Sequence, residues 1–314
     1  MEKRPITKIL RDSIFYFLVA MLIRFLRLLP RMTAIRLMRF LGGITFTLAG
    51  KARGKTIRHL SMAFDKEKSA AEINLLARRT FVHFFTAAAD LLRLPKLMDR
   101  GLDKIVTTEG MHHLDEAFTA GRGALMITAH YGNWEVLGAW LGLHEYPIKV
   151  VGTALFDPRL DKILVETRNK AGYTNIARGK GTREILRTLK EGKAVGMLID
   201  QDTNVPGVFV TFFGMPTHTP TGPVVLARKL KLPIIPIFMH MKSDFTYHIT
   251  CYPPVEQIRT DDEMHDIQVN TQRCSDIYEK VIRLHPEQWV WMHKRWMTRP
   301  LPGDPVPPVD KATP

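Results

Sequence analysis

A histidine and a glutamate five positions apart, His130 and Glu135, are the residues of this chain best suited to acid–base chemistry. On one continuous helix such a pair lies about 140° out of phase, so the side chains converge only if His130 occupies a turn. Gly132 can adopt the backbone of that turn, and Asn133 is a good N-cap for a helix that starts there. The pair then suits a general base with its orienting acid. The alternative is a histidine bonded at a strand end and a glutamate that only stabilises the helix start.

A second polar group, Asp200-Gln201-Asp202, follows another apolar run. If the chain stays extended, the two carboxylates point the same way, because side chains alternate with a period of two. Paired carboxylates suit a divalent cation, as in sugar-nucleotide glycosyltransferases, or they can orient basic groups and substrate hydroxyls. Because the pattern is so short, two solvated acids on a loop are a third interpretation.

Basic side chains gather around Arg168 and Arg178. A guanidinium group binds phosphate or a developing oxyanion through paired hydrogen bonds, so these two arginines are candidates for binding a substrate or stabilising a transition state. The alternative is a solvated, charged helix face.

The elements that must position these residues alternate between short apolar runs of strand type and helical patterns. Such alternation favours βαβ units and a mostly parallel sheet flanked by helices, an α/β fold. In such a sheet the ligand crevice lies beyond the carboxyl ends of the strands, and His130 and Asp200 both fall at such ends. We expect strands at 124–128, 148–151, 194–199, 234–238 and 245–252, and helices at 134–143, 160–171, 182–190, 223–230 and 262–284.

With 314 residues and 45% hydrophobic content the chain can bury a sizeable core, and we assign residues 31–298 to one α/β domain. Its two cysteines, Cys251 and Cys274, stand near neither a second cysteine nor a histidine cluster, so no disulfide framework and no zinc motif are expected. The net charge of +14 attracts acidic partners. Because the basic residues are spread along the whole chain, we favour a lipid surface or an acidic protein over nucleic acid as the partner.

Residues 1–30 are predicted to attach the chain to a membrane. The apolar run 14–23 is shorter than the roughly 20 residues that span a bilayer, and Arg24 and Arg27 can extend toward lipid headgroups. The segment therefore suits either a tilted anchor or a helix that lies in the interface, with a buried core helix as the alternative. At the other end, residues 299–314 are rich in proline and are predicted to be extended or disordered.

In order and spacing, these motifs resemble the lipid A biosynthesis acyltransferases. These are the late acyltransferases, of lauroyl or myristoyl type, that complete lipopolysaccharide, and they belong to the lysophospholipid acyltransferase-like superfamily. The resemblance covers nearly the whole chain. It rests on the His-x4-Glu pair, Arg168, Asp200-Gln201-Asp202, Phe212-Phe213-Gly214, Thr219-Pro220, Pro233-x-x-Pro236 and the block 285–296.

This resemblance implies transfer of a fatty acyl chain from acyl carrier protein to a hydroxyl of a lipid A precursor. The implied location is the cytoplasmic face of the bacterial inner membrane, and the implied chemistry needs neither cofactor nor metal. His130 would be the general base and Glu135 its partner, with Arg168 and Asp200 in the active site. A neutral histidine suits removal of a proton from a hydroxyl that attacks a thioester.

We expect direct transfer, because no serine or cysteine stands in a nucleophile-elbow motif. Backbone N–H groups of Gly132 and Asn133 are the expected oxyanion donors, and Asp202 and Arg178 are expected to line the substrate site. The segments 152–154 and 203–204 depart from the family pattern and leave the acceptor open between a lipid A precursor, a lysophospholipid and another glycolipid. A metal-dependent glycosyltransferase that uses Asp200 and Asp202, and a catalytically idle, membrane-anchored lipid-binding or interaction protein, are the remaining alternatives.

Overall fold

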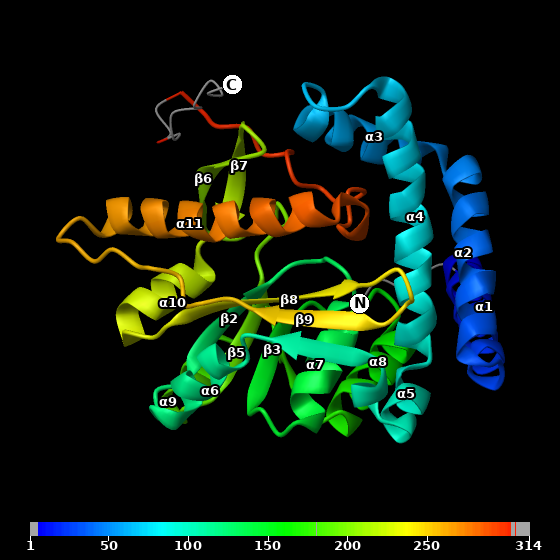
Figure 1. The fold of residues 1–314 in the computed structure, drawn as a ribbon, viewed down its shortest axis with the longest axis horizontal. Coiled ribbons are helices and arrows are strands. Elements are labelled where there is room, and N and C mark those ends of the chain that lie inside the picture. Colours follow the sequence, from blue (N-terminus) through cyan, green and yellow to red (C-terminus); the bar gives the residue numbers. More distant parts are fainter. Residues whose placement is uncertain (1–5, 180, 303–304, 306–314) are drawn as a thin grey trace.

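A seven-stranded sheet forms the centre of the protein (Figure 1). In this computed structural model, which describes residues 6–179, 181–302 and 305, the strand order is β1-β9-β8-β2-β5-β3-β4. Neighbouring strands of this sheet pair in parallel except β8 and β9, which are antiparallel. The predicted α/β fold with a mostly parallel sheet is thus confirmed. The strands are β1 Val106–Glu109, β2 Ala124–Thr128, β3 Ile148–Gly152, β4 Thr174–Ala177, β5 Ala194–Leu198, β8 Ile234–Met241 and β9 Tyr247–Cys251.

The central strands are apolar throughout because both of their faces are covered. Leu125 and Ile127 of β2 belong to a core with residues of α11 (Glu263–Leu284), whereas Ala124 and Met126 belong to a second core with residues of α7 (Trp134–Leu143). Figure 1 shows α11 and α7 on opposite sides of the sheet. Parallel strands buried in this way read as continuous apolar runs rather than alternating ones.

Apart from the helix at His112–Thr119, which was not predicted, the helices between the strands begin and end close to where the sequence predicts them. They are α6 His112–Thr119, α7, α8 Pro158–Lys170, α9 Thr182–Lys190, α10 Gly222–Leu230 and α11. Asn133, Asp157 and Asp262 each accept a hydrogen bond from a backbone N–H of the helix that follows, which satisfies one of the unpaired donors at a helix start. These local signals explain why the predicted bounds agree to within two residues.

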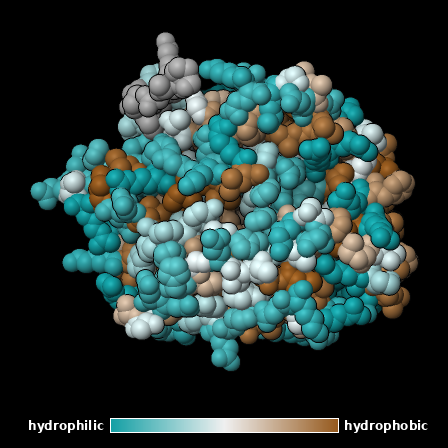
Figure 2. All heavy atoms as spheres, in the orientation of Figure 1, coloured by the Kyte–Doolittle hydropathy of each residue, from teal (hydrophilic) through white to brown (hydrophobic). Residues whose placement is uncertain are grey.

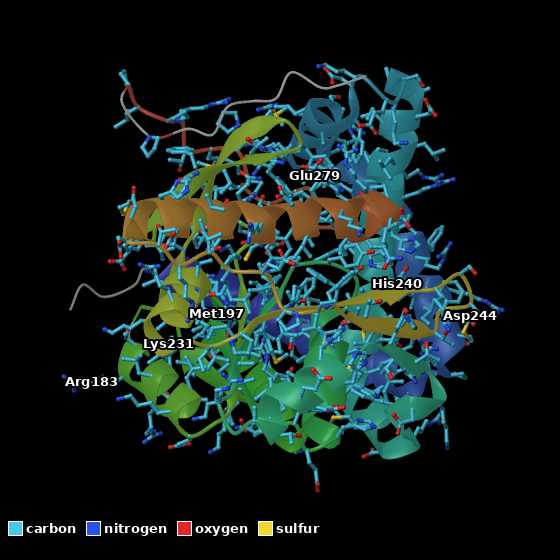
Figure 3. All side chains as sticks on the ribbon, turned by 60° about the vertical axis from the view of Figure 1, so that its left-hand side comes forward. Arg183, Met197, Lys231, His240, Asp244 and Glu279 are labelled. Atoms are coloured by element: carbon cyan, nitrogen blue, oxygen red, sulfur yellow. The ribbon has the colours of Figure 1, made fainter. Side chains whose placement is uncertain are left out.

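A hairpin, β6 (Gly207–Phe212) and β7 (Met215–Pro220), lies between β5 and α10, where no strand was predicted. Its turn residues Phe213 and Gly214 both have positive φ angles, 50° and 70°, as a two-residue hairpin turn requires. The hairpin is anchored to α11, because Glu279 accepts a hydrogen bond of 2.6 Å from the Phe213 N–H. Figure 3 shows Glu279 on the side of α11 that faces the hairpin, and Met197 of β5 below that helix.

Five helices form a layer beside the sheet (Figure 1). A capping box of Ser69 and Glu72 is present at the start of α4, which ends at Leu92, before Pro95. Long helix α4 runs alongside α2 (Figure 1), and Arg31 of α2 reaches the β8–β9 turn, where it donates to the Phe245 carbonyl. The layer consists of α1 Ile6–Leu28, α2 Arg31–Leu48, α3 Gly50–Phe64, α4 Ala70–Leu92 and α5 Leu94–Arg100; two short 3-10 turns, Leu102–Lys104 and Pro286–Gln288, complete the fold.

Large apolar side chains of α1 and α2 reach the surface, and Figure 2 shows apolar residues along the edge that these helices form. Within the part of the chain that the structure describes, no helix combines the length and the apolar content needed to cross a bilayer. The division into an anchor, a domain and a tail stays a prediction, and most of the tail lies outside the described residues. The exposed apolar residues of the two helices include Leu10, Ile14, Phe15, Phe17, Leu18, Met21, Phe25, Leu28, Phe40 and Leu48.

Candidate active site

A tight turn between β2 and α7 presents His130 at the edge of the sheet. Gly132 makes this turn possible, since its φ is +58° and a Cβ there would lie 1.7 Å from the carbonyl oxygen of Met239. The C-terminal block braces the turn from outside: the Gly132 N–H donates to the Gln288 carbonyl at 3.0 Å, and the Val290 N–H donates to the His130 carbonyl at 3.1 Å. The predicted turn is therefore present, and its backbone is held on both sides of Tyr131.

Asp200 orients His130. The carboxylate accepts a hydrogen bond of 2.9 Å from His130 Nδ1 and one of 2.8 Å from the His130 backbone N–H, while Trp289 Nε1 donates to it at 2.8 Å. Asp200 is only 1% exposed. Because Nδ1 faces a carboxylate, Nε2 is left as the nitrogen that can take a proton, as in a histidine–acid pair of a hydrolase.

Strand register brings the two residues together although they are 70 positions apart. β2 and β5 pair in parallel with Thr128 opposite Leu198. His130 and Asp200 each follow two residues beyond these partners, so they meet at the same edge of the sheet. This is the crevice position expected for an open α/β sheet.

The prediction that Glu135 orients His130 is corrected by the structure. The Glu135 carboxylate accepts hydrogen bonds from Nε and Nη2 of Arg168, the first at 2.9 Å, and from the Tyr173 hydroxyl at 3.0 Å. Burial raises the pKa of Tyr173, and the Glu135 carboxylate raises it further, so the phenol stays protonated and donates. Glu135 lies in the first turn of α7, where its carboxylate faces α8 and its arginine rather than the imidazole in the preceding turn.

Two other predicted substrate contacts also have protein partners. Arg168 binds Asn175 with the part of its guanidinium that does not contact Glu135, so most of its donors are already used. Asp202 accepts hydrogen bonds from the backbone N–H and the hydroxyl of Thr298, at 2.6 and 2.9 Å. Both residues thus hold elements in place. Arg178 is exposed, and both it and Arg168 line the cavity described below.

The Asp200 and Asp202 carboxylates do not form a shared cation site. One contacts His130 and Trp289, the other the C-terminal segment, and no group of three potential metal ligands was found among the described residues. The geometry therefore gives no support to the glycosyltransferase alternative, which needs both carboxylates on one ion.

The expected oxyanion donors are only partly available. The Gly132 N–H already donates to Gln288, so that assignment is corrected. Asn133 is the predicted N-cap: its Oδ1 accepts from the Val136 N–H at 3.4 Å, and its Nδ2 donates to the Tyr247 hydroxyl at 3.1 Å. Its side chain is therefore structural, and a role for its backbone N–H stays a prediction.

A cavity of about 560 Å³ opens beside His130. The polar side chains that line it include His130, Glu135, Arg168, Arg178, Gln201 and His293, and the imidazoles of His130 and His293 have their ring centroids 5.4 Å apart. Most of the other lining residues are apolar and come from the sheet, α7, α8 and α1. Apolar lining residues include Val19, Ile23, Met126, Leu137, Leu141, Ile148, Leu160, Ile163 and Leu164.

Sequence reasoning did not find three of these features. Trp289 and His293 belong to the block 285–296, for which the sequence predicted no role beyond the resemblance. Gln201 lies between Asp200 and Asp202, and only the two aspartates were predicted to act. No short-range pattern marks the cavity, because its walls come from elements as distant as α1 and α8. The signal in the sequence was the tryptophan-rich composition of the block 285–296.

The Asp200–His130 contact predicts a specific loss of stability in acid. Burial alone would raise the pKa of Asp200, but His130 and the hydrogen bonds from His130 and Trp289 lower it from 3.8 to about 2. A depressed pKa stabilises the fold above the unfolded value and loses that contribution as pH falls, here between about 4 and about 2. The contribution amounts to about 2 kcal/mol. We expect chemical unfolding at stepped pH to show this loss for the wild type and not for Asp200→Asn; equal slopes for both proteins would contradict it.

Comparison with known proteins relates this chain to a family. The family model described as bacterial lipid A biosynthesis acyltransferase matches residues 1–298. The phosphatidylinositol mannoside acyltransferase of Mycobacterium tuberculosis (strain H37Rv) is 28% identical over 216 residues, 66% of each chain. The lipid A biosynthesis palmitoleoyltransferase and lauroyltransferase of Escherichia coli K12 are 29% and 25% identical, over 65% and 64% of this chain and 65% of each relative. The matches thus span just under two thirds of these relatives' lengths.

Proposed function

Because this chain belongs to the bacterial lipid A biosynthesis acyltransferase family, we propose that it transfers a fatty acyl chain from a thioester to a hydroxyl of a lipid A-like glycolipid. One observation carries the proposal. The imidazole of His130, held by Asp200, lines a cavity whose other lining side chains are mostly apolar. A base beside a long apolar cavity is what the joining of an alcohol and a fatty acyl group requires.

The reaction follows from this arrangement. His130 Nε2 removes the proton of the acceptor hydroxyl while the oxygen attacks the thioester carbonyl. Asp200 stabilises the imidazolium that forms. When the C–S bond breaks, the leaving thiolate takes the proton from the imidazolium, and the new C–O bond is the ester. The thioester is already activated, so no covalent acyl-enzyme is needed.

The apolar part of the cavity would hold the acyl chain. Each methylene group removed from water contributes about 0.8 kcal/mol, so an apolar wall of this size binds a fatty chain without a specific polar contact. Helix α1 supplies Val19 and Ile23 to that wall. Arg159 ties the helix to the start of α8, since its guanidinium lies 4.2 Å from the ring centroid of Tyr16 and donates to the Asp12 carbonyl.

Acyl carrier protein is the donor that we propose. Acyl carrier protein is acidic, and a net charge of +14 would speed its encounter with this chain. Exposed Arg178, which lines the cavity, suits a phosphate, because guanidinium groups pair with phosphate oxygens. Arg178 could also pair with a phosphate of the glycolipid, so its charge supports a phosphate on either the acyl donor or the acceptor.

The cytoplasmic face of the inner membrane is the proposed location. The exposed apolar side chains of α1 and α2, with exposed Arg24 beside them, suit helices that lie in a bilayer interface. Half-buried Arg27 instead donates to the Leu92 carbonyl at 2.9 Å. Co-sedimentation with vesicles of anionic phospholipid measures this directly. The protein should remain in the supernatant if Phe15, Phe17 and Leu18 are changed to serine, and binding that is unaffected by the triple change would contradict the assignment.

The test of the function is product analysis. We expect the purified chain, given an acyl-loaded carrier protein and an under-acylated lipid A precursor, to yield a product heavier by one acyl group in the mass spectrum. Lysophospholipid and phosphatidylinositol mannoside are offered in parallel, because one group of relatives acts on the mannoside by name. Acylation of either lipid in place of the precursor would reassign the acceptor, and no acyl transfer to any of the three would refute the proposal.

A further inference from the structure

A tetrahedral oxyanion must form in the proposed reaction, and two of the candidate donors are occupied. The Gly132 N–H donates to Gln288, and the Arg168 guanidinium contacts Glu135 and Asn175. Stabilisation of the oxyanion by donors that are already in place is commonly the largest single contribution to such catalysis. A further donor among the residues that line the cavity would therefore add to any hydrogen bond from the Asn133 backbone N–H.

Gln201 carries such a donor. It follows Asp200 directly, and its half-buried side chain lines the cavity together with His130 and His293. Its Nε2 is shielded from solvent and has no hydrogen-bond partner in the described part of the chain. Several other buried polar atoms also lack a partner there, but only Gln201 among their residues lines this cavity. Since a buried donor without an acceptor costs free energy, its position calls for an acceptor that arrives with a substrate.

We propose that Gln201 is a catalytic residue whose side-chain amide donates a hydrogen bond to the thioester carbonyl oxygen as that oxygen becomes negative. This inference rests on the proposed acyl transfer. The terminal torsion of a glutamine is broad, so the amide can turn its Nε2 toward the cavity. No protein hydrogen bond is broken in that rotation, because Nε2 makes none.

The role is electrostatic, and Gln201 transfers no proton. When the acceptor oxygen forms its bond to the carbonyl carbon, the C=O electron pair moves onto the carbonyl oxygen, and His130 holds the proton of the hydroxyl. When the C–S bond breaks, the pair returns and the thiolate receives that proton. The amide N–H is present throughout, but its hydrogen bond is strongest while the oxygen is charged.

Steady-state kinetics of Gln201→Leu test the proposal, with Gln201→Glu and Gln201→Asn beside it. Leucine keeps the approximate volume and removes the donor. We expect kcat to fall roughly 10²-fold with little change in either KM. Glutamate, which places a negative oxygen beside the oxyanion, should lose more activity than leucine, and asparagine should retain part of it. The pH profile should stay that of the wild type, since His130 and Asp200 are unchanged.

Gln257→Leu is the matched control. The Gln257 amide donates to the Leu232 carbonyl at 3.0 Å and does not line the cavity. This change should therefore lower the melting temperature and leave kcat unaltered, whereas Gln201→Leu should lower kcat without lowering the melting temperature. If Gln201→Leu does not fold, Gln201→Asn carries the comparison.

A spectroscopic measurement separates this inference from the function itself. An acyl thioester with a ¹³C carbonyl, bound without any acceptor, should show an infrared C=O band at lower frequency in the wild type than in Gln201→Leu. Equal bands, a kcat within twofold of the wild type, or a loss confined to the KM of the acceptor would each overturn the role of Gln201. A wild-type protein that transfers no acyl chain, in contrast, would refute the proposed function.

Discussion

Replacing His130 with alanine is expected to lower acyl transfer roughly 10²–10⁴-fold. The imidazole is the base that lines the cavity, and alanine leaves no group there that can take the proton of the hydroxyl. Binding of the thioester should persist, because the apolar walls of the cavity are untouched. The measurement is kcat with a carrier-protein thioester, together with retention of the labelled thioester on the variant. Near-full transfer by this variant would remove His130 from the mechanism.

Asp200→Asn should lower acyl transfer by a similar factor. The carboxylate accepts from His130 Nδ1, from the His130 N–H and from Trp289 Nε1, and an amide can reproduce only part of that acceptance. The wrong tautomer of the imidazole is then favoured. Because the two residues act as a unit, the double variant should be little worse than either single one. A double variant whose loss equals the product of the two single losses would show that they act independently.

Glu135→Gln is the informative comparison, since Glu135 is also a buried carboxylate of this site. It holds the Arg168 guanidinium, and leaving that charge without its partner should lower the free energy of unfolding by roughly 3 kcal/mol. Transfer by the folded variant should fall less than for Asp200→Asn. If the folded Glu135→Gln protein loses as much activity as Asp200→Asn, Glu135 must move to the imidazole during the reaction.

Gly132→Ala is expected to have the largest effect on folding. Its φ of +58° is a left-handed backbone, which costs an alanine roughly 1–2 kcal/mol. The new Cβ would also meet the Met239 carbonyl oxygen at 1.7 Å, and a backbone atom cannot rotate away. We expect a total loss of about 3 kcal/mol or more in the free energy of unfolding. The folded fraction should transfer about 10²-fold more slowly, because a displacement of His130 by about 1 Å spoils the geometry.

Gly54→Ala provides the control for that change. Gly54 lies within α3 and has nothing within 4 Å of the added Cβ, so alanine should stabilise the helix by about 0.5–1 kcal/mol. Urea unfolding of both variants, combined with transfer assays, makes the comparison. Equal stability of Gly132→Ala and the wild type would show that the turn can adopt another backbone.

Much of the fold was predictable because its signals are local. The capping residues Ser69, Asn133 and Asp262, and the apolar runs of the buried strands, set where elements begin and end. The hairpin β6–β7 was missed because its turn, Phe213-Gly214, places a bulky residue at a positive φ, which sequence rules assign to asparagine, aspartate or glycine. Contact with α11 stabilises that turn.

The candidate site, like the fold, was predictable only in part. That His130 stands in a glycine turn before a capped helix follows from neighbouring residues, and the family resemblance follows from motifs spread along the chain. The choice of Asp200 over Glu135 as its partner depends on the pairing of β2 with β5, and on Arg168, which binds Glu135 from α8. Such contacts join residues tens of positions apart, and nearest-neighbour preferences carry no information about which strands lie side by side. The cavity, its unpartnered Gln201 amide and the support of the turn by residues 288–290 arise only when those distant segments pack together.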